Sequence, residues 1–269
     1  MSVTVSRLSV VIPSRLAPML PSDSEDRWYV ERALANVRGQ SAARDGLELE
    51  LIVGVDAGQG ERARERLGPE VLIVEAPRRS QASALNAAMA KATGEAIAFL
   101  EDDDLWSPEH LGTALQQLAD CDFVSSTQLE VTPEGAVLRI FDYATPSGWV
   151  MPRATLNRVG LFDEEYRWHL DTEWLGRLGQ SKLRRVHLVE ATAPISWDEI
   201  VGTRVGLPDI LRSGGGNVRL VRHESPWPLV RRTCHPGSGM AQIAKDPVKA
   251  AASKAEYDRM WKRFKCIPW

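Results

Sequence analysis

Four consecutive acids, Glu101 to Asp104, directly follow the apolar run Ala96 to Leu100. The apolar run has the length of a buried strand, so the acids lie at the carboxyl end of that strand. Open α/β sheets bind ligands in the crevice at this end of their strands. Carboxylate oxygens are hard ligands that suit Mg²⁺ or Mn²⁺ holding a diphosphate. The run therefore predicts a divalent metal site.

A helix start is the alternative explanation of the same acids. Ser107-Pro108-Glu109 opens a helix, and a helix N-terminus favours nearby carboxylates. A helix cap needs one acid, however, and this segment has four. The composite of a strand, four acids, Trp106 and a Ser-Pro helix start therefore favours metal binding.

Alternating strand and helix signals surround the acidic run. Apolar runs predict strands at residues 8–12, 49–55, 71–74 and 96–100, and helical spacing predicts helices at residues 28–37 and 83–92. This alternation predicts an α/β fold with a mostly parallel sheet and helices on its faces.

The second half of the chain is less regular. It is expected to contain strands at 123–127, 136–141 and 183–189, the last of these ending the sheet, helices at 153–159 and 171–180, and a glycine-rich connection at 213–217. Asp246-Pro247 then caps a final helix. Tyr257, Trp261 and Phe264 form one aromatic face of that helix, which we expect to dock on the body.

The composition is that of an ordinary globular protein. The 269 residues, 43% hydrophobic and 26% charged, suit one α/β domain with an appendage. The apolar runs are far shorter than the roughly 20 residues of a membrane-spanning helix, and the first is too short for a signal peptide. The three cysteines are widely spaced, which indicates reduced packing residues. We expect a cytoplasmic protein.

Charge is divided unevenly along the chain. Residues 201–269 contain 13 Lys and Arg against 5 Asp and Glu, a formal charge of +8, whereas residues 1–200 contain 20 against 31, a formal charge of −11. This predicts an acidic body at 1–200 and a basic extension at 201–269 that ends in a helix. The extension either complements the body or attracts an anionic partner.

Several stretches, in order along the chain, resemble the GT-A glycosyltransferases of the family-2 kind, which move a sugar from a nucleotide-sugar to an acceptor. The matching stretches are Leu8–Ser14, Ser83–Leu100, Glu101–Leu111, Val159–Glu164 and Asp171–Leu178. The resemblance covers about residues 8 to 190. It implies a Rossmann-like GT-A domain at 1–200, a nucleotide-sugar donor, Mn²⁺ or Mg²⁺ as cofactor, and an inverting transfer.

The resemblance also implies roles for individual residues. Asp103 is the leading metal ligand, with Asp104 beside it, and Glu101 stands where the family has its first Asp. His235 either completes the metal site, as a late His does in some GT-A enzymes, or is merely hydrogen-bonded or solvent-facing. The residues expected at the nucleotide-sugar are Pro13, Ser14, Arg15, Asp56, Arg79, Asn86, Glu101 and Asp102.

Family position makes Asp171 the general base that takes the proton of the acceptor hydroxyl. The alternative is an acid that only stabilises a helix start. Glu173 lies roughly 200° further around the same helix and is the weaker candidate for the base. In this scheme the metal neutralises the leaving diphosphate. Given the basic extension, we expect an anionic acceptor, either a lipid-linked glycan, an acidic polymer or, less readily, a nucleic acid.

Three rival functions remain at this stage. Gly58-x-Gly60-x-x-Ala63 after a strand, with Glu75 ending the next strand, would suit a dinucleotide-binding oxidoreductase. Residues 61–66 are charged on every face, which disfavours this rival. A sugar nucleotidyltransferase would need a glycine in the loop at residues 14–18, which has none. A non-catalytic nucleotide-sugar- or glycan-binding protein of the same fold stays open.

Overall fold

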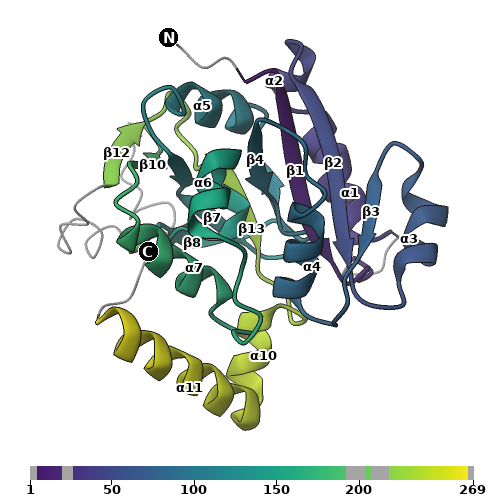
Figure 1. The fold of residues 1–269 in the computed structure, drawn as a ribbon, viewed down its shortest axis with the longest axis vertical. Coiled ribbons are helices and arrows are strands. Elements are labelled where there is room, and N and C mark those ends of the chain that lie inside the picture. The colour runs from purple at the N-terminus through teal and green to yellow at the C-terminus, as the bar shows by residue number, and fades with distance from the viewer. Residues whose placement is uncertain (1–4, 20–26, 192–203, 207–217, 266–269) are drawn as a thin grey trace.

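The computed structural model describes residues 5–19, 27–191, 204–206 and 218–265 as a mixed α/β fold with two sheets (Figure 1). The larger sheet has eight strands in the order β12-β10-β6-β9-β4-β1-β2-β3. The smaller sheet has five, in the order β11-β8-β7-β13-β5. Helices cover both faces of the larger sheet, as the alternation of signals in the sequence predicts.

The centre of the larger sheet is parallel. Strand β1 (Arg7–Ser14) lies between β2 (Glu48–Val55) and β4 (Ala96–Phe99), and β3 (Leu72–Glu75) extends the sheet beyond β2. Because β1, β2 and β4 are parallel, their carboxyl ends lie at one edge of the sheet. That edge therefore receives the residues that follow each of the three strands.

The other half of the larger sheet contains one reversed strand. Strand β9 (Val150–Pro152) is antiparallel to both β4 and β6 (Phe123–Ser126). Strands β10 (Arg185–Val189) and β12 (Val218–Arg222) then continue in parallel from β6.

Two hydrophobic clusters pack on the two faces of the larger sheet. The helices of the fold are α1 (Tyr29–Arg38), α2 (Ser41–Arg44), α3 (Gly60–Leu67), α4 (Gln81–Met89), α5 (His110–Gln117), the short 3-10 helix η1 (Pro146–Gly148), α6 (Arg153–Val159) and α7 (Leu170–Gln180). Val10 of β1 packs in one cluster with residues of α1 and α5, and Val11 packs in the other with residues of α4 and α7. Adjacent side chains of a strand point to opposite faces, so β1 joins both halves of the core.

The smaller sheet contains residues from the basic extension. It consists of β5 (Leu105–Trp106), β7 (Gln128–Val131), β8 (Val137–Phe141), β11 (Arg204–Val205) and β13 (Val230–Thr233). Strand β13 pairs with β7 in parallel and with β5 in antiparallel orientation. Since β5 follows the acidic run directly, β13 brings the extension to the predicted metal site.

The expectation that residues 183–189 form the last strand of the sheet is wrong, because β12 follows β10 in the larger sheet. Arg219 and Arg222 interrupt its apolar residues and conceal the strand pattern in the sequence. The expected division between residues 200 and 201, and the glycine-rich connection at 213–217, lie outside the described residues. Strands β12 and β13 nevertheless belong to the same sheets as residues before that division.

The chain continues into helices α10 (Gly239–Lys245) and α11 (Pro247–Phe264). As predicted, Asp246 caps α11, accepting the backbone N–H of Val248 at 2.9 Å. Helix α11 lies along α7 at the lower edge of the molecule (Figure 1). The expected aromatic face is only partly right, because Tyr257 and Phe264 pack on the core whereas Trp261 is 49% exposed. Among the described helices, none has the length and apolar character to cross a membrane.

Candidate functional site

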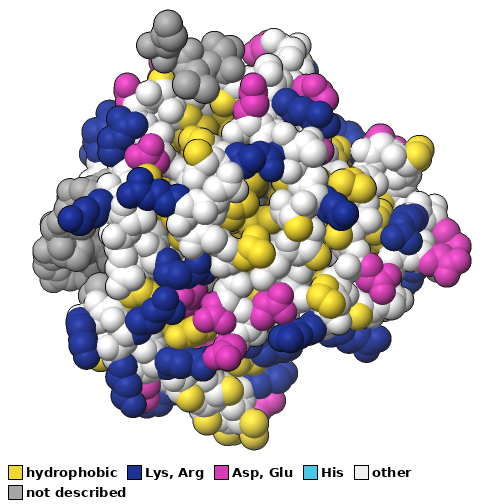
Figure 2. Space-filling view, viewed as in Figure 1, with side chains coloured by type: hydrophobic (Ala, Val, Ile, Leu, Met, Phe, Trp, Pro, Cys, Tyr) yellow, Lys and Arg dark blue, Asp and Glu magenta, His cyan; other side chains and the backbone are white. Residues whose placement is uncertain are grey.

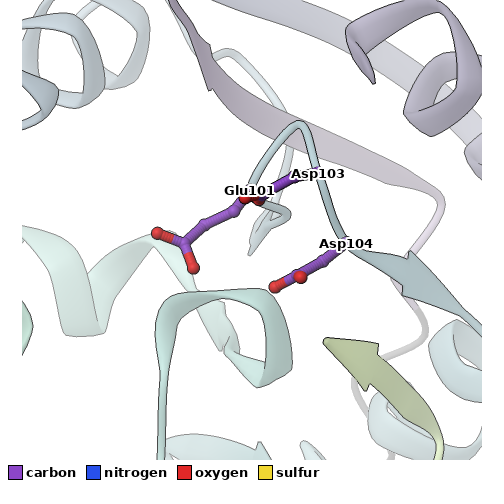
Figure 3. A group of neighbouring side chains, drawn as sticks. All are labelled: Glu101, Asp103 and Asp104. Atoms are coloured by element: carbon purple, nitrogen blue, oxygen red, sulfur yellow. The ribbon is translucent and has the colours of Figure 1, made fainter. Parts of the chain in front are cut away.

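The acidic run forms a loop between β4 and β5. Glu101, Asp103 and Asp104 each offer one carboxylate oxygen, and the three oxygens lie within 4.8 Å of one another. Figure 3 shows the side chains of Glu101 and Asp104 extending to the same side of this loop. We refer to these three residues as the acidic cluster. In the described part of the chain, they form the group of three neighbouring carboxylates that could hold a metal ion.

Asp104 is held in place by two other elements. Only 1% of the residue is exposed. Its Oδ2 accepts a hydrogen bond from the hydroxyl of Ser147 in η1 at 2.6 Å, and its Oδ1 accepts the backbone N–H of Thr233 in β13 at 2.9 Å. The basic extension therefore fixes one member of the acidic cluster directly.

The acids of the cluster repel one another. Burial, and then the charge of Asp103, raises the pKa of Glu101 to about 7. The same two causes raise the pKa of Asp104 well above its ordinary value. A divalent cation would remove this repulsion, and a set of three hard oxygens suits Mg²⁺ or Mn²⁺ better than zinc. The residues present therefore fit the expected metal.

Asp102 points away from the cluster, toward the end of β1. Its Oδ2 accepts a hydrogen bond from the hydroxyl of Ser14 at 2.5 Å, and that hydroxyl accepts the backbone N–H of Leu16 at 3.0 Å. Pro13 is buried in β1. The residues expected at the nucleoside from β1 and from the acidic run thus lie together, although their contact with a nucleotide stays a prediction.

Three arginines act on Asp56, which follows β2. Burial raises the pKa of Asp56, and the charges of Arg15, Arg79 and Arg167 oppose that rise. The sequence singled out Arg15 and Arg79 but missed Arg167, which precedes α7 and carries no local signal. Arg79 also donates to the carbonyl oxygen of Ala57, the residue after Asp56, at 3.4 Å. Several guanidinium groups near one site suit the recognition of phosphate.

Asn86 of α4 is used within the protein. Its amide nitrogen donates to the carbonyl oxygen of Phe162 at 2.9 Å, and its amide oxygen accepts the backbone N–H of Phe162 at 2.9 Å. Asn86 therefore fastens the loop around Phe162 to α4. Its predicted contact with the nucleotide-sugar stays a prediction.

His235 reaches the acidic cluster from the segment after β13. Its Nε2 lies 2.9 Å from Oδ2 of Asp103, and its ring lies over Tyr29 of α1 with 5.0 Å between the ring centroids. The structure thus brings together two of the residues predicted as metal ligands. His235 is thus a hydrogen-bond partner of Asp103, and its role as a further metal ligand stays a prediction.

Asp171 lies in the first turn of α7, near the acidic cluster. Its charge adds to the rise in the pKa of Glu101, after burial and Asp103. Its Oδ1 accepts the backbone N–H of Thr172 at 2.8 Å. Glu173, the weaker candidate, is fully buried and forms ion pairs with Arg177 and Arg263. Glu173 is therefore engaged within the protein, and the role of Asp171 as the base stays a prediction.

Two further arginines stabilise the acidic loop, a role that the sequence did not predict for either of them. Arg32 of α1 donates to the carbonyl oxygen of Asp103 and to the hydroxyl of Thr233, the latter at 3.1 Å. Arg232 of β13 pairs with Glu130 at 3.0 Å. Burial lowers the pKa of Arg232, but Glu101, Asp104 and Glu130 outweigh it and raise that pKa. These contacts span long stretches of sequence, so no local pattern predicts them.

The glycine-rich turn before α3 is already occupied by a side chain. Glu75 accepts the backbone N–H of Gly58 at 2.6 Å and that of Gly60 at 3.0 Å. These are the amides that a dinucleotide phosphate would need. The expectation that α3 is charged on every face is wrong, because Ala63 and Leu67 are buried. It is therefore Glu75 that argues against dinucleotide binding.

Parallel strands that deliver an acidic loop to their carboxyl edge, with arginines and a helix-start acid around it, define a GT-A fold. Two solved structures share this fold. TarS of S. aureus matches with a TM-score of 0.54 and 14% identity, covering 88% of this chain and 38% of that chain. TarS residues 1–349 in complex with UDP-GlcNAc match with a TM-score of 0.54 and 14% identity, covering 86% of this chain and 60% of that one.

The family described as Glycosyl transferase family 2 matches residues 9–144, and the chain belongs to this family. Among curated proteins, the uncharacterized glycosyltransferase YwdF of Bacillus subtilis (strain 168) is 25% identical over 160 residues, which is 51% of this chain and 60% of that protein. The uncharacterized glycosyltransferase alr2836 of Nostoc sp. (strain PCC 7120) is 29% identical over 103 residues, or 36% of this chain and 30% of that protein. The chain thus spans less than two thirds of either relative.

Proposed function

We propose that this chain is an inverting, metal-dependent glycosyltransferase that moves a sugar from a nucleoside-diphosphate-sugar to an acceptor hydroxyl. The observation that carries the proposal is the convergence of the acidic cluster, the arginines around Asp56, and Asp171 at one edge of the sheet. The complexes of the similar TarS fragment with UDP and with UDP-GlcNAc support a nucleotide-sugar as donor.

The acidic cluster would hold Mn²⁺ or Mg²⁺, with His235 as a further ligand or as a support of Asp103. A bound divalent cation neutralises negative charge that develops on the leaving diphosphate. Arg15, Arg79 and Arg167 would bind the same donor through its phosphates. Asp56, together with the pair of Ser14 and Asp102, would lie at the nucleoside.

Asp171 would take the proton of the attacking hydroxyl. Thr172 supplies the hydrogen bonds to Oδ1 of Asp171, and in the described part of the chain no hydrogen bond reaches Oδ2. One carboxylate oxygen is therefore oriented by the protein and the other is left to accept a proton. Attack from the face opposite the leaving diphosphate would invert the anomeric centre.

The proposed acceptor is anionic: a lipid-linked glycan, an acidic polymer or, less readily, a nucleic acid. Figure 2 shows Lys and Arg side chains surrounding Asp and Glu side chains over the lower part of the molecule. Arg259 and Arg263 of α11 pair with Glu165 and Glu173 of the body, so part of the extension's charge serves internal pairing. Arg231 is exposed on β13 beside Arg32, and is the cation best placed to meet an acceptor at the acidic cluster.

A screen of nucleotide-sugars with and without Mn²⁺ tests the proposed function. Release of a nucleoside diphosphate, by transfer or slow hydrolysis, is expected only with the metal present. Release of pyrophosphate from a nucleoside triphosphate and a sugar phosphate would instead identify a nucleotidyltransferase. Metal-dependent binding without turnover of any donor would identify a binding protein of the same fold. We also propose a cytoplasmic location, a reducing compartment with which the free thiols of Cys121 and Cys234 agree.

A further inference from the structure

We propose that Glu256 of α11 is a positioning residue that fixes the turn before α7 and thereby orients Asp171. The inference rests on the proposed function, because it takes Asp171 as the general base. It assigns to the C-terminal helix a role in the transfer step that is separate from binding the acceptor.

The carboxylate of Glu256 accepts three consecutive backbone N–H groups. Oε1 accepts the N–H of Arg167 at 2.9 Å, and Oε2 accepts those of Trp168 at 2.8 Å and His169 at 3.1 Å. Glu256 is only 8% exposed. An ionised carboxylate is the one side-chain group that can accept several N–H groups without presenting a donor to them. The three N–H groups of this turn therefore require an ionised carboxylate at position 256.

The turn held by Glu256 is where α7 begins. His169 is the N-cap residue of α7, and its side chain makes no capping hydrogen bond to the helix. A carboxylate near a helix N-terminus is favoured both by the free N–H groups and by the helix dipole. Glu256 thus fixes, from another helix, the N-cap residue of α7 and the two residues before it. Asp171 follows two residues after His169, so its position depends on this turn.

Two more polar contacts from α11 flank Asp171. Nε2 of His169 lies 2.9 Å from the hydroxyl of Ser253, one turn before Glu256. Arg263, two turns after Glu256, donates to Oε1 of the buried Glu173 at 2.7 Å. Helix α11 therefore contacts α7 both before and after the proposed base. Figure 1 shows the two helices running alongside each other.

The test replaces Glu256 by glutamine, which keeps the shape and removes the charge. Glutamine has one acceptor oxygen and an NH₂ group that would face the turn, so at least one N–H loses its acceptor. We expect Glu256→Gln to lower kcat about tenfold, because a small displacement of a base slows proton transfer steeply. The same turn carries Arg167, a proposed donor-binding residue, so the KM of the donor is expected to rise as well. The kcat is therefore measured at saturating donor, where it reports on the transfer step and not on donor binding.

Asp258→Asn is the matched control, because it makes the same acid-to-amide change on the same helix. Asp258 is exposed, and among the described residues its one ion-pair partner is Lys254, at 2.6 Å. Hydrogen exchange of the amides of residues 167–169 should accelerate in Glu256→Gln and stay unchanged in Asp258→Asn. Melting temperatures of both variants should remain well above the assay temperature, which separates positioning from unfolding.

The decisive measurement repeats Glu256→Gln in an Asp171→Asn background. If Glu256 acts through Asp171, the second change causes no further loss of kcat, because interacting sites are not additive. An equal tenfold loss in both backgrounds, or an unaltered kcat in the single variant, overturns the inference while leaving the proposed function intact. A wild-type chain that transfers no sugar refutes the proposed function, and the positioning role with it. Should Glu256→Gln unfold, Ser253→Ala breaks only the bond to His169, and a smaller loss with the same non-additivity is expected.

Discussion

Acid should destabilise this protein through His110, a residue packed beneath the metal loop. His110 is fully buried, and burial, then the neighbouring His223, lowers its pKa from 6.5 to about 3. Neither ring nitrogen has a hydrogen-bond partner within the described residues. The imidazole stacks on Trp106 with 4.7 Å between the ring centroids. Trp106 belongs to β5, the strand directly after the acidic loop. A charge on His110 would therefore be created directly against the segment that carries the metal site.

The sign of the effect follows from the two pKa values. Between pH 6.5 and 3 the unfolded chain binds a proton at His110 that the folded chain does not bind. The free energy of unfolding therefore falls as pH decreases through this window. The pKa of His110 is about 6.5 in the unfolded chain and about 3 in the folded chain. Lowering the pH from 8 to 5 therefore reduces the free energy of unfolding by about 2 kcal/mol through this one group. Above about pH 7 His110 is neutral in both the folded and the unfolded chain, so its burial causes no loss of stability there.

The assay is urea unfolding of the wild type and of His110→Phe at pH 8 and at pH 5. Phenylalanine retains the stacking on Trp106 and cannot be protonated. We expect the difference in unfolding free energy between the two pH values to be smaller in the variant by about 2 kcal/mol. His187, whose burial also lowers its pKa to about 3, contributes equally to both proteins and cancels. An equal pH dependence in wild type and variant would refute the argument.

Three substitutions test the proposed site. Asp103→Ala should leave the fold intact, because the side chain is 22% exposed. It should abolish the Mn²⁺-dependent stabilisation by the donor, which is about 2.7 kcal/mol at a donor concentration of 100 times the Kd. Retained stabilisation in a thermal shift assay would exclude Asp103 as a metal ligand. Asp171→Asn should keep donor binding and lose about 10²-fold in transfer rate, whereas a rate near that of the wild type would place the base elsewhere. Arg231→Glu should raise the KM of an anionic acceptor and reduce the salt sensitivity of transfer without changing the melting temperature; an unchanged KM would remove Arg231 from the acceptor site. Arg232 cannot serve this test, because it pairs with Glu130 and acts on the acidic cluster.

The first half of the fold could be predicted because its signals are local. Strand β4 is a short apolar run with four acids behind it, and β1 and β2 are similar runs that end in Pro13-Ser14 and Asp56. Parallel pairing then places the ends of all three strands at one edge without further information. The placement of the acidic loop and of Asp56 follows from that topology. The direction of each side chain, such as the turn of Asp102 toward Ser14, and the approach of Arg167 to Asp56 required the structure.

Contacts between distant segments could not be predicted in the same way. The N–H of Thr233 reaches Asp104 across 129 residues of sequence, and Glu256 reaches Trp168 across 88. Neither Thr233 nor Glu256 belongs to a motif, and an acid in the middle of a charged helix is ordinarily a solvated residue. Its burial against three backbone N–H groups depends on how α11 packs on α7, which no local periodicity encodes.

The uneven division of charge along the sequence does not show which charges pair with one another in the fold. A count by sequence separates an acidic body from a basic extension, yet Arg232 of that extension lies among the acids of the metal loop, and Arg263 pairs with a Glu173 that is fully buried. Removing one partner of a buried ion pair leaves the other charge uncompensated in a medium of low polarity. The extension is therefore part of the electrostatic balance of the domain. Its charges near α7 and β13 stabilise the geometry of the acidic site, and only exposed cations such as Arg231 are left to act on a partner.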